Sequence, residues 1–460
     1  MPTAPATAAV ASARRPRLAW GLAAFAWLLP FHAFVITAMF GALGWPAPVV
    51  RAIAAWKEAL VALLLGLAVT RTVRSPQAIR GIYWPDLIFA GLTILALGYA
   101  VGANAFFGSD LPLAAQLYAL RDAGFVSLLY FVGRASPEVA ESPRLLRALF
   151  LVGVVTSAIA VLERLFVTPE ILVVLGAARY IQDFLGASVI AAGNPYGLPD
   201  NYWTMVGSHS VQRAGSTYMS GQGFAVPFLI VLPAATLWAL SASGRRALAR
   251  WFGYGLLWVG LIFTVTRMTI VACVLETVII IAARRRWGAL VGLGLVGVAG
   301  LGAAMLLVPG LATFVWETLT WQSPSSEWHL GDWTAGFDQV VRQPLGVGLG
   351  ATDFVAARFG VTGLTGDNQY LKYGVELGVV GLLLHMGVIA AALVSGLRAL
   401  RRSPNTSAGT GGLLLVATTV GIALNAMTAV VFNSPMLAYP FFWLAGSVTT
   451  VSHQAEAISP

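Results

Sequence analysis

The chain has 460 residues, of which 58% are hydrophobic and only 10% are charged, whereas a soluble domain carries about 25% charged residues. This composition excludes a soluble globular fold and indicates an integral membrane protein. The net charge is +9, and the single cysteine, Cys273, lies in an apolar run, which excludes a disulfide within the chain and a cysteine-based metal site.

The apolar segments predict an all-α, polytopic fold in which residues 1–460 form one membrane domain. A spanning helix needs about 20 apolar residues. The first apolar run is too long for the core of a signal peptide and lacks a cleavage site, so we expect an uncleaved first span. About twelve spans are predicted, near residues 18–44, 50–70, 84–104, 113–133, 148–166, 222–241, 251–266, 268–283, 287–309, 371–396, 411–432 and 435–452.

Most basic residues lie in short links between these spans. Eighteen of the 28 fall in six clusters, which are Arg14, Arg15, Arg17; Arg71, Arg74, Arg80; Arg134, Arg144, Arg147; Arg245, Arg246, Arg250; Arg284, Arg285, Arg286; and Arg398, Arg401, Arg402. With twelve spans and a cytoplasmic N-terminus, all six clusters face the cytoplasm, as the positive-inside rule requires. Both termini are therefore expected to be cytoplasmic. Nucleic-acid binding is not expected, because it needs a basic face on a folded domain.

Two long segments face the opposite side of the membrane, at residues 167–221 and 310–370. Long loops in compact folds are usually functional or disordered. The second segment contains four tryptophans between positions 316 and 333, which argues against disorder and predicts short amphipathic helices at the membrane surface. Function is therefore expected on this outer face.

Several cations lie on the outer side, against the positive-inside rule. The candidates for binding a diphosphate are Arg51, Lys57, Arg121, Arg213, Arg267 and Arg342. Arginine forks match phosphate oxygens, and as a converging set these residues predict a diphosphate clamp. Taken singly, Arg51, Arg121 and Arg213 are better interpreted as salt-bridged structural residues, and Arg121 has a neighbouring counter-ion in Asp122.

Arg267 is the strongest single candidate. Residues 251–283 have arginine clusters at both ends, which predicts a helical hairpin with Arg267 at its tip. Each arm is short for a membrane core of about 30 Å. A guanidinium drawn below the membrane surface needs an anion, and the alternatives are a structural ion pair or snorkelling to the interface.

Other outward motifs carry weaker signals. The glycine loop at 344–350 is either a phosphate- or sugar-binding loop or a tight turn. His329 is a candidate general base, because histidine titrates near neutrality. No HExxH, carboxylate cluster or CxxC motif predicts a metal site, and we expect no cofactor.

Three charges gather in "TGDNQYLKYGVELGVVG" (365–381). Lys372 and Glu376 form an i,i+4 pair on the first turns of a span. Asp367 precedes that helix and is a candidate N-terminal cap. A purely structural role covers all three residues.

The order of these motifs resembles the O-antigen ligase and polymerase family. In that family a histidine, then Asn, Ser or Gln, is followed after nine residues by Gly, and after two more by Gly, Thr or Tyr. Here the matching residues are Asp367, Asn368, Gly378 and Gly381. Further similar segments are "WKEAL" (56–60), "RAGSTY" (213–218), "TVTR" (264–267) and "RQPLGVGLG" (342–350).

The resemblance implies a GT-C-like, metal-independent glycosyltransferase of the bacterial inner membrane. It would transfer a glycan from undecaprenyl diphosphate, on the periplasmic face, to a lipid-linked acceptor (polymerase) or to lipid A-core (ligase). Arg213 and Arg267 match the diphosphate-binding arginines, and Asp367 stands where the ligases have their histidine. "DN-x-YL" and "S-x-x-x-HL" (325–330) are more similar to the exopolysaccharide-polymerase branch, with Asp367 and His329 as candidate catalytic residues. We expect structural, supporting roles for Glu58, Asn368, Lys372, Glu376 and Gly378.

The implied partners are the lipid-linked oligosaccharide, the bilayer and, in the cell, a flippase and a chain-length regulator. Two other classes stay open. A secondary transporter or lipid flippase would have inverted repeats and charges at mid-depth, and no internal repeat is evident. A non-catalytic scaffold of an export complex is the third alternative.

Overall fold

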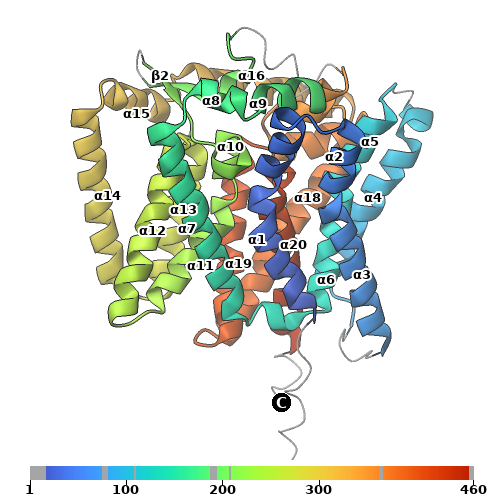
Figure 1. The fold of residues 1–460 in the computed structure, drawn as a ribbon. Helices are drawn as coiled ribbons and strands as arrows, with labels where there is room; N and C mark the ends of the chain where they lie inside the picture. Colours follow the sequence, from blue (N-terminus) through green and yellow to red (C-terminus); the bar gives the residue numbers. More distant parts are fainter. Residues whose placement is uncertain are drawn as a thin grey trace, which may run out of the picture.

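The structure is a computed structural model that describes residues 17–74, 81–107, 110–186, 194–206, 209–361 and 366–454. Figure 1 shows a bundle of long helices whose axes run in roughly the same direction. Short helices and a two-stranded hairpin lie across one end of this bundle, and we call them the cap. The last helix ends at the opposite end.

Long apolar runs form the bundle because a helix satisfies all of its backbone hydrogen bonds within one segment. The helices of the bundle, with the short helices that extend or interrupt them, are α1 (Arg17–Thr37) with π-helix η1 (Ala38–Ala42), α2 (Ala47–Ala54), α3 (Trp56–Arg74), α4 (Trp84–Phe107), α5 (Leu113–Leu120), π-helix η3 (Arg121–Phe125), η4 (Val126–Leu128), α6 (Leu129–Arg134), α7 (Pro143–Phe166), α10 (Gly221–Ala225), α11 (Phe228–Leu240), α12 (Arg245–Phe263), α13 (Arg267–Ala283), α14 (Trp287–Leu307), α18 (Gln369–Arg402), α19 (Ser407–Asn425) and α20 (Pro435–Gln454).

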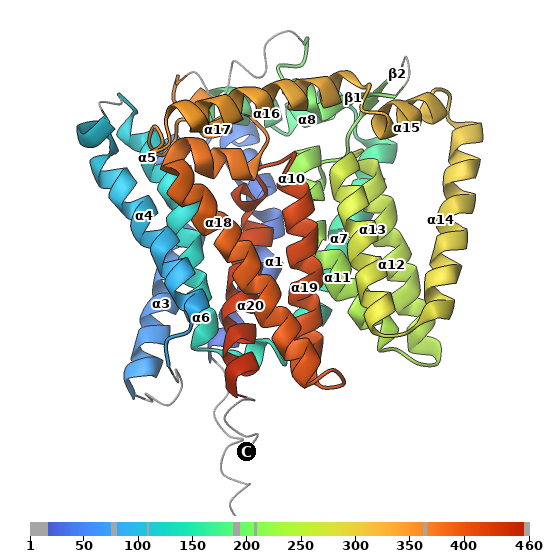
Figure 2. The same cartoon turned by 180° about the vertical axis from the view of Figure 1, so that it is seen from behind.

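Among the described residues, eight helices are long and apolar enough to cross a membrane, so the chain is a polytopic membrane protein. They correspond to eight of the twelve predicted spans. The other four predicted spans are also helical, at α5 to α6, α12, α13 and α20, and run beside the eight in Figure 2. Their length or composition differs from that of a typical spanning helix: α13 has only 17 residues, and α12 begins in an arginine cluster. The count of twelve stays a prediction.

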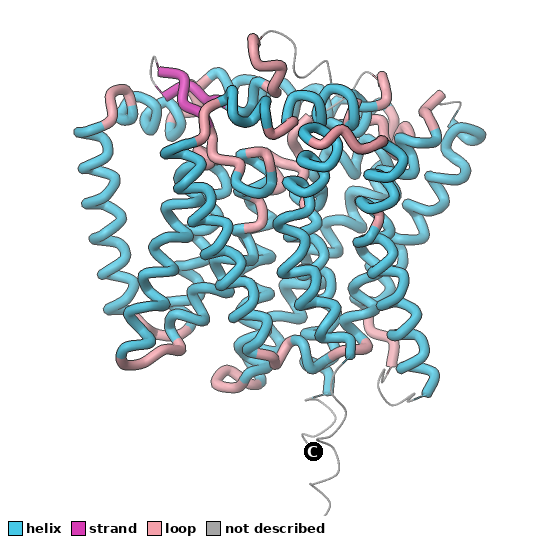
Figure 3. The backbone as a smooth tube through the Cα atoms, viewed as in Figure 1, coloured by secondary structure: helices cyan, strands magenta, loops and turns pink. Residues whose placement is uncertain are grey.

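The cap is built from both predicted outer segments. Figure 3 shows its strands and loops at the same end as its short helices. Its elements are α8 (Pro169–Val174), α9 (Ala177–Arg179), π-helix η6 (Tyr180–Phe184), β1 (Trp203–Val206), β2 (His209–Gln212), η9 (Ser216–Tyr218), α15 (Leu311–Leu319), α16 (Pro324–Arg342) and α17 (Asp353–Arg358). The strands pair antiparallel, with Trp203 opposite Gln212. Trp316 and Trp328 are exposed, which suits helices at a membrane surface.

The arginine-rich helix ends lie at the end of the bundle opposite the cap. They include the C-terminal ends of α3, α6 and α18 and the N-terminal end of α12 (Figures 1 and 2). Arg14, Arg15 and Arg80 lie outside the described residues. This distribution agrees with the positive-inside expectation, and the orientation itself stays a prediction.

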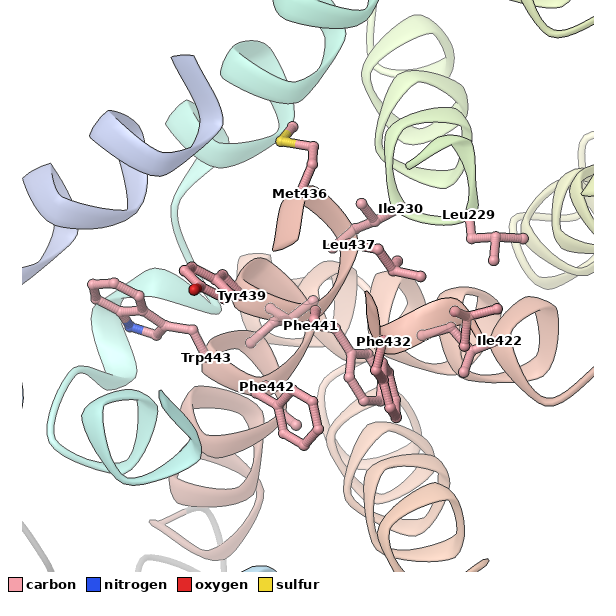
Figure 4. Close-up of a cluster of buried hydrophobic side chains, with 14 of the residues drawn as sticks. Leu229, Ile230, Ile422, Phe432, Met436, Leu437, Tyr439, Phe441, Phe442 and Trp443 are labelled. Carbon is pink, nitrogen blue, oxygen red and sulfur yellow. The ribbon is translucent and has the colours of Figure 1, made fainter. Parts of the chain in front are cut away.

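The apolar core lies between α11, α19 and α20. Figure 4 shows the side chains of Phe432, Phe441 and Phe442 beside Leu229 and Ile422, which come from neighbouring helices. The ring centroids of Phe432 and Phe442 are 5.0 Å apart. This packing fixes α20 against the bundle.

Helix α14 stands apart from the bundle in both views (Figures 1 and 2). None of its 21 residues is buried. A Cβ atom added to any of its glycines, such as Gly292 or Gly297, would meet no atom within 4 Å. It is attached through the links to α13 and α15 at its two ends.

Candidate functional site

The turn between α12 and α13 carries Arg267 at its end. Helix α12 ends at Phe263, residues 264–266 form the turn, and α13 begins at Arg267. The backbone N–H of Ala214 donates to the carbonyl of Phe263 at 2.9 Å, which brings the segment after β2 against the turn. The expectation of a helical hairpin with Arg267 at its tip is confirmed.

The Arg213 side chain holds this turn. Its Nε donates to the Thr264 carbonyl at 2.7 Å, Nη2 donates to Thr266 Oγ1 at 2.6 Å, and Nη1 donates to the Asn201 carbonyl at 3.2 Å. The carbonyls at a helix C-terminus lack partners within the helix, so one side of the guanidinium closes the end of α12. Arg213 is thereby fixed beside the residue that precedes Arg267.

A buried carboxylate anchors the segment that carries Arg213. Glu163, on the last turn of α7, accepts hydrogen bonds from the backbone N–H groups of Gly215, at 3.1 Å, and Ser216. The Ser216 hydroxyl donates to the Thr156 carbonyl at 2.7 Å, and its φ of +49° marks a tight backbone turn. Glu163 therefore positions Arg213 through the backbone.

Substitution Glu163→Gln should test this anchoring role. One of the two N–H groups would lose its acceptor, at a cost of about 1–3 kcal/mol. We expect a lower unfolding temperature and about tenfold weaker binding of inorganic diphosphate, both measured on the purified protein. Glu170→Gln, which changes an exposed carboxylate of α8, should alter neither quantity, and an equal effect of both substitutions would argue against the role.

Arg267 joins α13 to the cap. Its Nη1 donates to Thr318 Oγ1 at 3.0 Å and to Ser323 Oγ at 2.9 Å. The guanidinium carbon lies 5.3 Å from the centroid of the Phe314 ring on α15. Among the described residues, neither Arg267 nor Arg213 forms a salt bridge. Both positive charges are held by neutral groups.

The middle of α16 faces these arginines. His329 lies close enough to Arg267 and Asp332 for both charges to act on its ring. Asp332 Oδ1 accepts a hydrogen bond from the Gly366 N–H at 2.8 Å. A Cβ atom on Gly366 would lie 2.5 Å from the Trp328 indole. The chain that leads into α18 is therefore packed directly against α16.

Asn368, and not Asp367, caps α18. Its Oδ1 accepts hydrogen bonds from the N–H groups of Tyr370, at 2.9 Å, and Leu371, at 3.0 Å. The expectation that Asp367 forms the cap is therefore wrong: Asn368 has the extended backbone of an N-cap residue, with φ −143° and ψ 113°, and its side chain reaches the first turn. Asp367 lies near Arg213, because its charge acts on the pKa of that guanidinium.

The electrostatics of the site follow from burial and from these neighbours. Burial and the nearby Arg267 charge lower the pKa of Arg213 to about 10, against the opposing effect of Asp367. Arg213 thus stays protonated at neutral pH. Burial lowers the pKa of His329, with Arg267 adding to and Asp332 opposing this shift, so its imidazole is mostly neutral at pH 7. Its Nδ1 is buried and has no hydrogen-bond partner in the described structure.

We call Arg213, Arg267, His329, Asp332 and Asp367 the arginine–carboxylate site. Two adjacent cations without acidic ion-pair partners can bind a diphosphate. The carboxylate of Asp367 or the neutral imidazole of His329 can accept a proton. Within the described ranges, no group of three or more His, Cys, Asp or Glu side chains could hold a metal ion.

Lys372 and Glu376 form a buried ion pair that supports the cap. Lys372 Nζ lies 3.1 Å from Glu376 Oε1, and the two side chains are 3% and 2% exposed. The same oxygen accepts hydrogen bonds from the Gly350 N–H, at 3.2 Å, and from the Thr352 N–H and hydroxyl, at 3.2 and 2.6 Å. The pair thus fixes the loop that leads into α17.

The glycine loop at 344–350 packs on a kink of α18 at Gly378. Gly378 has φ +71°, and a Cβ there would lie 2.4 Å from the Pro344 carbonyl oxygen. The N–H groups of Val347 and Gly348 donate to α18 carbonyls at 2.9 and 3.0 Å. Because these two N–H groups already donate to carbonyls, they are not available to a phosphate, and the tight-turn alternative describes this part of the loop. Asn368 thus caps α18, and Gly378 forms its kink.

Arg121 and Lys57 belong to a different polar cluster, between α1, α3 and η3. Arg121 lies 2.7 Å from Asp122 and 3.7 Å from Glu58, and Lys57 lies 3.3 Å from Glu58. Lys57 Nζ is also 3.3 Å from His32 Nε2. Local carboxylates therefore neutralise these two cations, and no contact in the described structure joins them to the arginine–carboxylate site.

Arg51 and Arg342 also lie outside the arginine–carboxylate site, beside other residues than those predicted for the clamp. The Arg51 guanidinium lies 5.6 Å from the centroid of the Phe184 ring. Arg342, at the C-terminal end of α16, is 72% exposed and pairs with Asp338 at 2.9 Å, one helical turn away. The predicted convergence of six cations is therefore reduced to the pair Arg213 and Arg267.

Sequence reasoning missed several residues of the site. Glu163 had a signal, because a carboxylate on the last turn of an apolar span needs partners. Asp332 lies three residues after His329, which puts both on one face of a helix. Thr318 and Ser323 carry no signal, because their contacts with Arg267 depend on how α15 and α16 fold over the bundle.

Part of the chain matches a known protein family. Residues 252–386 match the family model described as O-antigen ligase. This segment is therefore similar to the O-antigen ligase domain. Members of this family are membrane glycosyltransferases that act as ligases or polymerases of polysaccharides. The domain runs from α12 to α18 and contains Arg267, His329, Asp332 and Asp367, whereas Arg213 and Glu163 come from the chain before it. No curated protein matches the chain.

Proposed function

We propose that this protein is a periplasmic-face polysaccharide polymerase, which transfers a glycan from undecaprenyl diphosphate to a lipid-linked acceptor. The observation that carries the proposal is the position of Arg213 and Arg267. They lie side by side, neither has a salt bridge in the described structure, and both are near Asp367 or His329. The O-antigen ligase domain supports lipid-linked glycans as the substrate class.

The reaction requires these residues to stabilise the leaving diphosphate and to accept the proton of the acceptor hydroxyl. An acceptor hydroxyl oxygen forms a bond to the anomeric carbon of the donor sugar, and the bond from that carbon to the diphosphate oxygen breaks. The diphosphate leaves with the bonding electrons, so negative charge grows on its oxygens. Preorganised cations stabilise this charge most strongly where water is excluded, which is the proposed role of Arg213 and Arg267.

The acceptor proton needs a base on the same side of the site. Asp367 stands at the position at which the ligases have a histidine, and we assign the proton to its carboxylate. His329 and Asp332 line the other side, where the neutral imidazole can hydrogen-bond the acceptor. Asp367 in place of the histidine favours the polymerase over lipid A-core ligation. The description of the matched domain favours a ligase. The identity of the product decides between the polymerase and the ligase.

Substitution Arg267→Gln is the direct test of the diphosphate role. We expect transfer to fall by about 100- to 1,000-fold, because one donor to the growing charge is lost. Arg267→Lys should be less affected, since it keeps the charge and loses the fork. The assay separates the products formed from a defined lipid-linked repeat in proteoliposomes.

Arg342→Gln is the matched control, because it removes an exposed outer arginine that pairs with Asp338. Its transfer rate should stay within about twofold of the unmodified protein. Unchanged product from Arg267→Gln, or an equal loss in both variants, would remove the diphosphate clamp. Chain elongation of the lipid-linked repeat would support the polymerase, and transfer to lipid A-core alone would support the ligase.

A further inference from the structure

Four arginines at the cap end gather around aromatic rings, away from the arginine–carboxylate site. They come from α2, η3, α9 and α17, and the labelled helices α2, α9 and α17 lie at the cap end of the molecule (Figures 1 and 2). We call the set the arginine–aromatic patch; its members are Arg51, Arg121, Arg179, Arg358, Phe40, Tyr118, Tyr180, Phe184 and Phe359.

One half of the patch is formed by η1, α2, α9 and η6. The Arg51 guanidinium lies 5.6 Å from the Phe184 ring centroid, and the Arg179 guanidinium lies 5.1 Å from the Phe40 ring centroid. The two rings themselves are 5.0 Å apart. Two arginines are thus held over one pair of packed rings.

The other half is formed by α5, η3 and α17. Arg121 and Arg358 both lie over the Tyr118 ring, with guanidinium carbons 4.8 and 4.4 Å from its centroid. The ring of Phe359 packs beside it, with centroids 5.4 Å apart. Two guanidinium groups therefore share one aromatic platform.

Tyr180 joins the two halves. Its ring stacks on Phe184 with centroids 5.5 Å apart. Its hydroxyl is close enough to Arg121 and Arg358 for their charges to act on it. A Cβ on Gly186 would lie 3.3 Å from the Arg358 carbonyl, which places α17 against the end of η6. The four arginines therefore line one continuous surface.

The charge of the patch is only partly neutralised. Arg121 is paired with Asp122 and Glu58, while Arg179 has only a loose contact with Asp183 at 3.9 Å. Arg51 and Arg358 take part in no salt bridge among the described residues. Arg51 and Arg179 are exposed and Arg358 is half-buried, so an anion can reach them.

A guanidinium that lies over a ring uses its face for the ring and keeps its N–H edge for an anion. A single diphosphate needs two adjacent arginines, whereas these arginines are distributed over several elements, as a chain with repeated negative charges requires. We propose that the arginine–aromatic patch binds an anionic glycan whose carboxylates repeat along the chain. This rests on the proposed function in one respect: the glycan is the acceptor or the product of the transfer.

The test is a binding titration with the full-length protein in nanodiscs of zwitterionic lipid. The probes are an oligogalacturonate of about ten sugars and a neutral malto-oligosaccharide of equal length. We expect the acidic probe to bind at least tenfold more tightly, with an affinity that falls as salt is added. Arg51→Gln/Arg179→Gln/Arg358→Gln should weaken this binding at least tenfold. Arg246→Gln, at the opposite end of the molecule, should stay within about twofold.

Thermal unfolding of each variant shows whether it is folded. The single substitution Arg51→Gln changes an exposed residue, and we expect it to weaken binding of the acidic probe several-fold. Equal binding of the two probes, or an unchanged affinity in the triple variant, would overturn the proposal. Displacement of the acidic probe by phosphatidylglycerol in the nanodisc would assign the patch to lipid headgroups and would also overturn it. The titration needs no turnover, so the loss of transfer in Arg267→Gln tests the proposed function separately.

Discussion

Substitution Asp367→Asn is expected to slow glycan transfer by about 100- to 10,000-fold, the range for loss of a positioned base. The asparagine keeps the size of the side chain and cannot take the acceptor proton. The cap of α18 should persist, because it comes from Asn368. Donor binding should change little. Single-turnover transfer from a lipid-linked repeat measures the rate, and a donor titration measures the affinity.

Two further variants make this prediction specific. Asp338→Asn removes an exposed carboxylate of α16 outside the site and should leave the rate within about twofold. His329→Gln separates the two candidate bases. Full activity of Asp367→Asn together with a large loss in His329→Gln would move the base to the imidazole.

Substitution Glu376→Gln is expected to destabilise the fold by about 3–5 kcal/mol, because it removes the negative charge that lies 3.1 Å from the buried Lys372 ammonium. The amide also places N–H groups where Thr352 and Gly350 donate to the carboxylate. The loss should appear as a lower unfolding temperature of the purified protein in detergent. The loop before α17 should become accessible to protease first.

A double variant identifies the cause of this loss. Lys372→Met/Glu376→Leu removes both charges, and we expect it to recover part of the stability, since apolar pairs often replace buried ion pairs at little cost. Recovery should be incomplete, because the N–H groups of Gly350 and Thr352 stay unpaired. A Glu376→Gln protein as stable as the unmodified one would show that the pair is dispensable.

Local chemistry made much of the framework predictable. Apolar runs located the spans, and short arms between arginine clusters placed Arg267 at a hairpin tip. The i,i+4 spacing of Lys372 and Glu376 predicted their contact correctly. In each case, residues close in sequence determine the outcome, so helix geometry alone was sufficient.

The composition of the site could not be predicted in the same way. Six outward cations were candidates for one clamp, and the difference between Arg213 and Arg121 depends in part on which carboxylates of other helices lie within reach in space. Glu58 reaches Arg121 from another helix, whereas Arg213 meets carbonyls and hydroxyls. The cap of α18 went to Asn368 because the backbone angle at the helix start decides which side chain reaches the first turn.

Helix α14 has a consequence for how this protein tolerates change. Because none of its residues is buried and it packs on the core through the half-buried Leu293, exchanges among alanine, valine and leucine at its exposed positions alter few protein contacts. Selection on α14 then acts on its mean hydropathy and its length, and not on the identity of single side chains. Sequence drift should therefore be fastest there, within the very domain by which the family is matched.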